Sequence, residues 1–395
     1  MKKINAKWTF FYATFIALSP AYANDISGNI SLEGRYFSQD ALHTGQEDGG
    51  FSLSLQPEFR HRWDNDHKAF TFIPFYRWDD KDKERTHGDI RQLDLTVAKG
   101  DWEFQAGISK VFWGVAESQH LVDIINQNDS IENLDGEDKL GQPMLRASRI
   151  MDNGSLSLYI LPYFRERTFA GVKGRLRTPL VVDTDQTTYE SNNEEEHVDY
   201  ALRWNQTFDA IDIGLSWVDG TSREPELRVN NTSTALNPHY AQIQQVGLDL
   251  QYTGEAWLWK LEAIRRESNT TGYNAAVGGF EYTLSGVAES AADLGLLAEY
   301  HVDSRDEQAT SPLQNDIFLG TRLALNDTQS SELLAGAMVD IDNQSKSLRL
   351  EASRRLGDNI KINLEAQIFM DIDSNDLLNA LRHDDYLLVE FQRFF

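Results

Sequence analysis

Apolar and polar residues alternate one by one along most of the chain from Ile30 to Phe395, and the spacing typical of helices is nearly absent. Near the beginning, for example, Phe51, Leu53 and Leu55 alternate with serine residues. Such alternation is the pattern of a β-strand with one apolar and one polar face. The pattern therefore predicts an all-β protein.

The connections between these runs differ in length. Short turns are rich in aspartate, asparagine and glycine, which suit turns because glycine and asparagine accept positive φ and aspartate bonds its own backbone. Short and long connections are expected to alternate strictly, as in outer-membrane barrels with short periplasmic turns and longer external loops. The longer polar segments are 38–50, 78–88, 112–143, 164–196, 219–240, 304–315 and 372–384.

The number of runs predicts a transmembrane antiparallel up-and-down β-barrel of about 18 strands. Sixteen strands remain possible, because the stretch 255–303 has the least clear pattern. A soluble sandwich or propeller is the main structural rival, but no propeller repeat is visible. The expected strands are 27–37, 51–62, 68–78, 88–98, 101–111, 144–151, 154–163, 197–207, 210–218, 240–253, 255–267, 272–285, 292–303, 315–325, 331–342, 346–356, 358–371 and 385–395.

Residues 1–23 do not follow the strand pattern. Three lysines precede a short apolar stretch at 8–18, and an Ala-Tyr-Ala sequence ends at Ala23. This order is typical of a cleaved secretory signal peptide. We therefore expect a signal peptide at 1–23 and a single outer-membrane barrel at 24–395, exported in a Gram-negative bacterium.

Composition narrows the possibilities further. The chain has no cysteine, which excludes a cysteine nucleophile, a cysteine-ligated metal and a lipid-anchored cysteine. The formal net charge of −25 disfavours nucleic acid as a partner. No run after Ala23 reaches the 18 apolar residues of a membrane helix. The mean hydropathy of −0.49 is compatible with a membrane barrel, because in alternating strands the polar residues offset the apolar ones in the average.

The last run places apolar residues at every second position up to Phe395, except for Arg393. This ending resembles the signal that the barrel-assembly machinery reads, so we expect this machinery, outer-membrane lipid and lipopolysaccharide as partners. Aromatic residues near the ends of runs suggest the girdles that mark the membrane interfaces. They are Tyr36, Phe59, Trp102, Trp204, Trp217, Tyr252, Trp257 and Phe391.

The polar faces of the predicted strands carry many charges. Charged groups avoid hydrocarbon, so they are expected to point into the lumen, where they either pair to brace the wall or line water. The predicted lumen-lining residues are Arg35, Arg60, Arg203, Lys260, Arg266, Arg349, Glu351, Arg355 and Glu365, with Glu58, Arg62, Glu262, Glu299, His301, Lys361 and Glu390 on the same faces.

The segment 109–129 has the only dense mixture of tryptophan, histidine, carboxylates and amides in a loop. Leu121, Ile124 and Ile125 add a short apolar stripe. A loop this apolar is expected to fold into the barrel, so 112–143 is a candidate constriction loop. Its predicted constriction residues are Trp113, Glu117, His120, Asp123, Asn126 and Asp129, with the first four at the narrowest point.

The run Val-Phe-Trp-Gly-Val-Ala-Glu-Ser at 111–118 is followed by Asp-Ile-Ile-Asn-Gln-Asn-Asp at 123–129. This stretch resembles the DUF1302-like outer-membrane β-barrel family and is also similar to alginate-export-type porins. The likeness covers residues 107–129, and Gln127 stands where that family tends to have proline. The resemblance implies a porin-like barrel in the outer membrane and does not imply a particular substrate.

Enzyme motifs fit poorly, because the chain contains no G-x-S-x-G, H-E-x-x-H or P-loop sequence. Residues 371–376 begin like a calcium loop but lack its glycine, and Arg382 replaces the closing glutamate. We therefore predict no catalytic residues, no metal and no cofactor. A Ser-His pair has no fixed sequence order, so an enzyme that modifies lipid or lipopolysaccharide remains an alternative.

The sequence thus predicts a porin-like channel for passive or facilitated passage of a small or oligomeric solute. A charged lining would select the solute, and the 112–143 loop would set the bore. The alternatives are the enzyme, which requires a lipid-facing Ser-His pair near the external rim, and a non-conducting structural barrel or adhesin. No motif specifies the solute, the ion selectivity or the oligomeric state.

Overall fold

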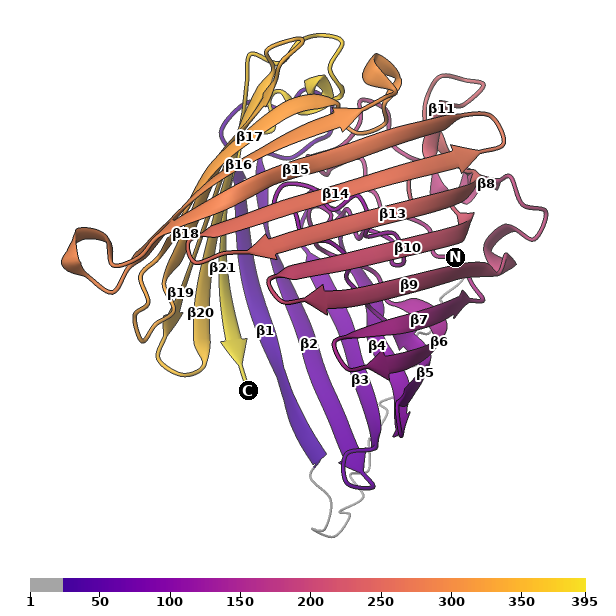
Figure 1. Ribbon diagram of the computed structural model, residues 1–395. Coiled ribbons are helices and arrows are strands. Elements are labelled where there is room, and N and C mark those ends of the chain that lie inside the picture. The colour runs from indigo at the N-terminus through magenta and orange to yellow at the C-terminus, as the bar shows by residue number, and fades with distance from the viewer. Residues whose placement is uncertain (1–23) are drawn as a thin grey trace, which may run out of the picture.

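The computed structural model describes residues 24–395, which form a closed antiparallel β-barrel of 18 strands (Figure 1). Each barrel strand pairs with the next barrel strand along the chain, and β1 pairs with β21 to close the barrel. The prediction of an up-and-down barrel with 18 strands is therefore confirmed. The expected signal peptide, 1–23, lies outside the described residues.

The strands agree closely with the runs of alternating residues. The barrel strands are β1 (Asn24–Phe37), β2 (Gly49–Trp63), β3 (Lys68–Asp79), β4 (His87–Lys99), β5 (Trp102–Ser109), β6 (Gln142–Met151), β7 (Gly154–Leu161), β9 (Asp199–Phe208), β10 (Ile211–Thr221), β13 (Gln242–Thr253), β14 (Trp257–Ser268), β15 (Gly272–Leu284), β16 (Asp293–Asp303), β17 (Asn315–Ala324), β18 (Glu332–Asp340), β19 (Lys346–Leu356), β20 (Ile360–Met370) and β21 (Tyr386–Phe394).

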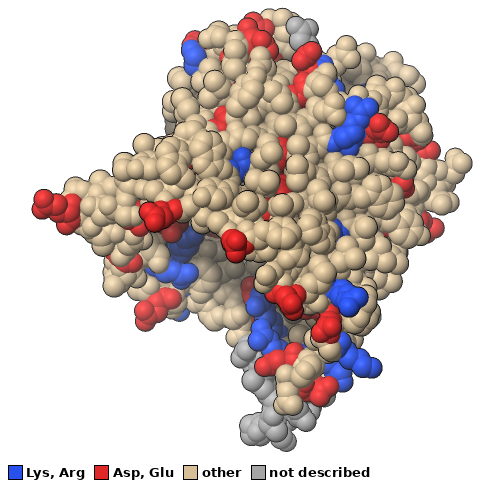
Figure 2. Space-filling view, viewed as in Figure 1, with Lys and Arg blue, Asp and Glu red and all other residues tan. Residues whose placement is uncertain are grey.

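The outer face of the barrel is apolar. On β2, Phe51 and Leu53 are 63% and 46% exposed on the outside, whereas Ser52 and Ser54 are buried on the inside. Figure 2 shows that most of the outer wall in this view carries no charged side chain. An apolar outer surface that alternates with a polar interior is the pattern of a barrel surrounded by lipid.

Aromatic rings cluster where strands begin at the end of the barrel that holds both chain termini. Trp257 and Trp259 of β14 stack at 5.6 Å between ring centroids and contact Phe280 of β15 at 5.2 Å. Trp102 and Phe104 of β5 stack in the same way at 6.0 Å. These rings point outward, where an interface girdle requires them.

The lengths of the connections do not alternate strictly, so that part of the prediction is wrong. At the end opposite the termini, the turns 269–271 and 341–345 are short. At the end with the termini, 285–292 is long and extends outward as a hairpin tip (Figure 1). The backbone of this connection folds on itself through a hydrogen bond from Val287 N to Ala292 O. The connection is therefore stabilised by its own backbone, although it lies at the end where short turns were expected.

The remaining loops carry small elements of their own. A three-stranded sheet joins β8 (Thr188–Tyr189), β11 (Glu226–Val229) and β12 (Leu236–Tyr240). Within residues 24–395, no helix is long and apolar enough to cross a membrane. The helices are short 3-10 turns: η1 (Thr184–Gln186), η2 (Glu194–Glu196), η3 (Val287–Glu289), η4 (Asp306–Gln308) and η5 (Leu377–Leu381).

Candidate functional site: the lumen and its inserted loop

The segment 110–141 between β5 and β6, here called the inserted loop, lies inside the barrel. Glu117 of this loop accepts a hydrogen bond of 2.6 Å from Arg322 of β17, which is on the wall opposite β5. Near its other end, Glu132 accepts hydrogen bonds from Arg77 of β3. The loop therefore crosses the lumen, as its apolar stripe predicted.

The first half of the inserted loop packs against an apolar patch of the inner wall. Val122 and Ile125 are fully buried there. Burial of such a side chain contributes roughly 1.5–3 kcal/mol, so this contact is one of the anchors of the loop. The core joins Trp113, Val122, Ile124 and Ile125 of the loop to Met144, Tyr159, Leu161, Ala201, Val218, Ile243, Ile264, Tyr273 and Ala275 of β6 to β15.

Two buried wall carboxylates bind the backbone of the loop. Glu262 of β14 accepts hydrogen bonds from the amides of Val115 (2.7 Å) and Ala116 (3.0 Å). Glu299 of β16 accepts hydrogen bonds from the amides of Glu117 (2.7 Å) and Ser118 (2.9 Å). A buried carboxylate is stable only with such partners, so the wall and the loop satisfy each other.

Gly114 makes this close approach possible. Its φ is +139°, and a Cβ added there would lie 2.9 Å from Glu262 Oε1 and from His120 Nδ1. Glycine is the residue that accepts such a backbone conformation without strain. The glycine of the Trp-Gly pair therefore has a structural reason that the sequence alone did not reveal.

His120 lies between two carboxylates, Glu137 at 2.7 Å and Glu262 at 3.6 Å. Burial lowers the pKa of this histidine, but the hydrogen bonds and charges of the two carboxylates outweigh burial and raise the pKa to about 10. His120 is therefore positively charged at neutral pH, and it joins the two ends of the loop to β14.

The second half of the loop is bound by arginines of the opposite wall. Arg77 of β3 donates hydrogen bonds of 2.7–3.0 Å to Glu132 and one of 3.0 Å to Glu33 of β1. Arg91 of β4 donates one of 2.6 Å to Asp129. Paired in this way, the buried arginines and carboxylates compensate each other's charge.

An inner cavity of about 540 Å³ remains between the loop and the wall formed by β17 to β21 and β1 to β3. The open space is thus off-centre, on the side that the apolar core leaves free. Its lining carries eight carboxylates, Glu33, Glu117, Glu132, Asp138, Glu332, Glu351, Glu365 and Glu390, and four cationic side chains, Arg35, Arg77, Arg322 and Lys361.

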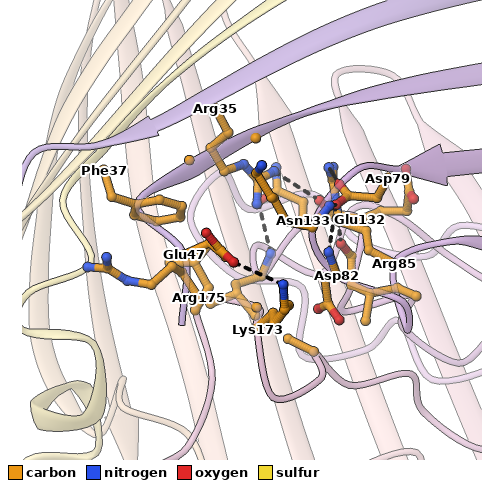
Figure 3. Close-up of a pocket in the computed structure, with 18 of the residues that line it drawn as sticks. Arg35, Phe37, Glu47, Asp79, Asp82, Arg85, Glu132, Asn133, Lys173 and Arg175 are labelled. Atoms are coloured by element: carbon orange, nitrogen blue, oxygen red, sulfur yellow. Dashed lines mark hydrogen bonds and ion pairs between the residues drawn. The ribbon is translucent and has the colours of Figure 1, made fainter. Parts of the chain in front are cut away.

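A smaller outer cavity of about 60 Å³ lies toward the long loops (Figure 3). Figure 3 shows Glu47 and Lys173, whose ion pair of 3.0 Å borders this cavity. The lining residues that it shares with the inner cavity are Arg35, Glu132 and Asn133. These three residues therefore stand where the two cavities meet.

Of the predicted constriction residues, Glu117 lines the inner cavity. Trp113, His120 and Asp123 line neither of these two cavities. Trp113 is 4% exposed within the apolar core, and Asp123 binds Lys139 at 3.0 Å. They bind the loop to itself and to the wall, because that side of the lumen is filled with apolar side chains.

The other two predicted constriction residues are also buried. Asn126 donates hydrogen bonds to the carbonyls of Ser109 (2.9 Å) and Leu140 (2.8 Å), which ties the two ends of the loop together. Asp129 is fully buried, and hydrogen bonds with His87 and charge from Arg91 lower its pKa to about 2 against the effect of burial. Both residues are structural.

The predicted lumen-lining residues separate into groups. Arg35, Glu351 and Glu365 line the inner cavity. Arg349 pairs with both of these glutamates and donates a hydrogen bond of 2.6 Å to Asp135 of the loop. The others brace the wall or lie near the end with the termini: Arg203 pairs with Asp249, Lys260 with Glu117, Arg266 with Glu224 and Arg60 with Glu58, and Arg355 lies over Phe394.

Several important residues were missed by sequence reasoning. Arg77 lies between the outward-facing Tyr76 and Trp78, so its position in the alternation already predicts an inward side chain. Arg91 follows Ile90 in the same way. Glu132 and Asn133 carry no such signal, because the sequence does not reveal which part of a loop faces open space.

His87, Asp129 and Glu132 are close enough together to hold a metal ion. However, Arg91 and Arg77 donate hydrogen bonds to the two carboxylates. A cation would have to displace both guanidinium groups. The cluster therefore fits a hydrogen-bonded network better than a metal site.

Ser118 and His301 form the Ser-His pair closest to the enzyme alternative, with Oγ 2.8 Å from Nε2. The Ser118 hydroxyl donates to Glu299 at 2.5 Å, and Glu299 also binds the amides of Glu117 and Ser118. The amides of Glu117 and Ser118 are therefore occupied by Glu299 and are not available to stabilise an oxyanion. The pair also lies inside the barrel, whereas the enzyme alternative requires a pair that faces lipid.

Together, the fold and this site define a closed β-barrel whose lumen is narrowed by an inserted loop, the arrangement of porin-like barrels. No family model and no curated protein matches the chain, so membership of the DUF1302-like family remains a prediction.

Two solved structures illustrate the likeness in fold. A triple mutant of a Rhodopseudomonas blastica porin has 12% sequence identity and a TM-score of 0.46, covering 94% of this chain and 100% of its own. OmpT, an outer membrane protein of Vibrio cholerae in its trimer form, has 10% identity and a TM-score of 0.48, covering 95% and 100%. The strand pairing of the chain itself, rather than these values, establishes the barrel.

Proposed function

We propose that the protein is an outer-membrane channel through which small hydrophilic solutes pass without an energy source. The observation that carries this proposal is the charged inner cavity of about 540 Å³ inside a closed barrel with an apolar outer face. A barrel of this many strands is wide enough to leave an aqueous channel. A Gram-negative outer membrane is the membrane in which such barrels reside.

The lining of the inner cavity favours cations over anions. Its carboxylates outnumber its cationic side chains by eight to four. A cleft lined mainly by one sign of charge raises the local concentration of ions of the opposite sign. We therefore expect small cations and solutes that carry an amine to pass more readily than anions.

The small outer cavity also favours one competing function, a barrel that does not conduct. Its volume of about 60 Å³ and the contacts at Glu132 narrow the path toward the long loops. Liposome swelling with sugars of increasing size separates the two functions. A channel lets the smallest sugars swell the vesicles, whereas a closed structural barrel or an adhesin does not.

The decisive experiment is conductance of the purified, folded protein in planar bilayers. Because the chain has no cysteine, Asn133→Cys creates a single thiol where the two cavities meet. We expect stepwise channels whose conductance falls when a bulky methanethiosulfonate reagent modifies this thiol. The control is Asp358→Cys in the exposed turn between β19 and β20, where modification should have little effect.

Two outcomes would contradict the proposal. Folded protein that neither conducts nor swells vesicles would favour the structural barrel. If modification at position 133 and modification at position 358 changed the conductance equally, the conducting path would not run beside the inserted loop.

A further inference from the structure

Asp138, like Glu332 but unlike the other six carboxylates of the inner cavity, has no hydrogen-bonding or ion-pair partner for its side chain among the described residues. It lies in the last part of the inserted loop and is exposed to the cavity that it lines. Within residues 24–395, its carboxylate makes no hydrogen bond or ion pair. Only its backbone carbonyl has a partner, the amide of Asp129 at 2.8 Å.

The other acidic residues of the lining mostly have partners. Glu117 pairs with Arg322 at 2.6 Å, and Glu132 pairs with Arg77 at 2.7 Å. The remaining partners are Arg85 at 2.9 Å for Glu33, Arg349 for Glu351 and Glu365, and Asn363 at 2.7 Å for Glu390. Ion pairs largely cancel at a distance, but the neutral Asn363 leaves the charge of Glu390 in place, and one arginine serves two glutamates. Asp138 therefore shares the net negative charge of the lining with these groups and with Glu332.

The surroundings of Asp138 are predominantly acidic. Glu132, Asp135 and Asp129 of the same loop raise the energy of its charged form, while Arg91 of β4 and Lys110 at the start of the loop oppose them. Several carboxylates around one site make full ionisation of all of them costly. Asp138 has no partner of its own, so it is the group most free to take up a proton.

We propose that Asp138 makes the cation preference of this channel depend on pH, because the preference decreases when this carboxyl gains a proton. This inference rests on the proposed function, since it requires a conducting lumen. At high pH the ionised group attracts cations into the space between the loop and β17 to β3. At low pH the neutral group leaves a smaller cation preference, which the remaining carboxylates of the lining maintain.

The pKa of Asp138 lies in a range that makes such a change observable. Its place inside the barrel, away from bulk water, and the nearby carboxylates of Glu132 and Asp135 raise the pKa to about 7. An ordinary surface aspartate ionises near 3.9 and would stay charged throughout the neutral range. The cation preference should therefore change most steeply around neutral pH.

The test is the reversal potential in a potassium chloride gradient, measured in planar bilayers from about pH 5 to about pH 9, a range that contains the titration and excludes that of ordinary aspartates. For the natural sequence we expect the cation-to-anion permeability ratio to rise by about twofold or more across this range, with its midpoint near neutrality. Asp138→Asn should remove this rise and keep the ratio at all pH values near the low-pH value of the natural sequence.

Glu332→Gln is the matched control. Glu332 also lines the inner cavity and is exposed, but it lies at the beginning of β18, away from the acidic part of the loop. This variant should keep the pH dependence of the natural sequence.

The inference and the proposed function fail in different ways. Absence of any conductance would defeat the proposed function. Channels that conduct but show the same rise with pH in Asp138→Asn, or no rise in the natural sequence, would overturn the role of Asp138. At about pH 5, where the carboxyl is neutral in the natural sequence, we expect both proteins to have similar single-channel conductance, because Asp138→Asn then has the same bore and the same lining charge.

Discussion

The backbone amide of Val115 donates a hydrogen bond of 2.7 Å to the carboxylate of Glu262, which joins the tip of the inserted loop to β14. The same carboxylate accepts bonds from Ala116 and Val122. Hydrogen bonds to a charged group contribute about 1.5–3 kcal/mol each, so this one side chain is a major anchor.

Glu262→Ala should therefore release the first half of the loop from the wall. We expect single-channel conductance to increase and to fluctuate, because the freed segment moves within the lumen. Deletion of residues 115–135 should increase the conductance in the same direction. Glu58→Ala is the control, since Glu58 faces inward and pairs with Arg60 away from the loop. An unchanged conductance in Glu262→Ala would show that the loop does not set the bore.

Gly114→Ala should disturb the same contact through size and backbone strain. Its added methyl group would need the space now occupied by Glu262 Oε1 and His120 Nδ1. We expect faster proteolysis of the loop and a smaller increase in conductance than in Glu262→Ala. Gly100→Ala measures the cost of positive φ alone, because nothing lies within 4 Å of its added Cβ. Equal effects of the two substitutions would exclude crowding at Glu262 as the cause.

His120 should make attachment of the loop depend on pH in the alkaline range. Its pKa in the folded protein, about 10, is above its ordinary value of 6.5. The stabilisation from its charge is therefore fully present below pH 6.5 and is lost as pH rises through about 10. The protection of residues 112–123 against hydrogen exchange, relative to the intrinsic exchange rate at each pH, should decrease across this interval. His120→Gln should show low protection throughout. Constant protection in the natural sequence would contradict this expectation.

Arg77 should be the most costly arginine of the lumen to remove. Its loss leaves the buried carboxylates of Glu33 and Glu132 without this partner. Loss of one partner of a buried ion pair costs about 3–5 kcal/mol. Arg77→Ala should lower the midpoint of urea unfolding in detergent micelles, and Glu132→Ala in the same chain should restore part of the loss. Purely additive effects of the two substitutions would rule out direct coupling.

The strands could be predicted because lipid imposes a simple rule on the outer face. Every outward position must be apolar, so the alternation fixes the strands, and the bounds of β19 at 346–356 agree completely with the expected run. The interior obeys no such rule. Tyr159 and Leu161 alternate with outward-facing Leu156, Leu158 and Ile160, yet they are buried in the core inside the barrel.

The candidate site was only partly predictable for the same reason. The apolar stripe of the inserted loop correctly predicted that the loop folds inward. It did not indicate which loop residues would face water, because that depends on the strands on the far side of the lumen. Glu132 and Asn133 meet Arg77 and Glu365 across 55 and 232 positions of the chain, distances over which a single sequence carries no pairing signal.

The off-centre lumen divides the barrel into two kinds of wall. Strands β6 to β15 are covered on both sides, by lipid outside and by the apolar core inside, so most substitutions there alter packing. Strands β17 to β21 and β1 to β3 carry the side chains that line the inner cavity. Variation among those of them that do not bind the inserted loop can change which solutes pass. The apolar core and the buried Arg77 network meanwhile preserve stability, so selectivity and folding can evolve almost separately.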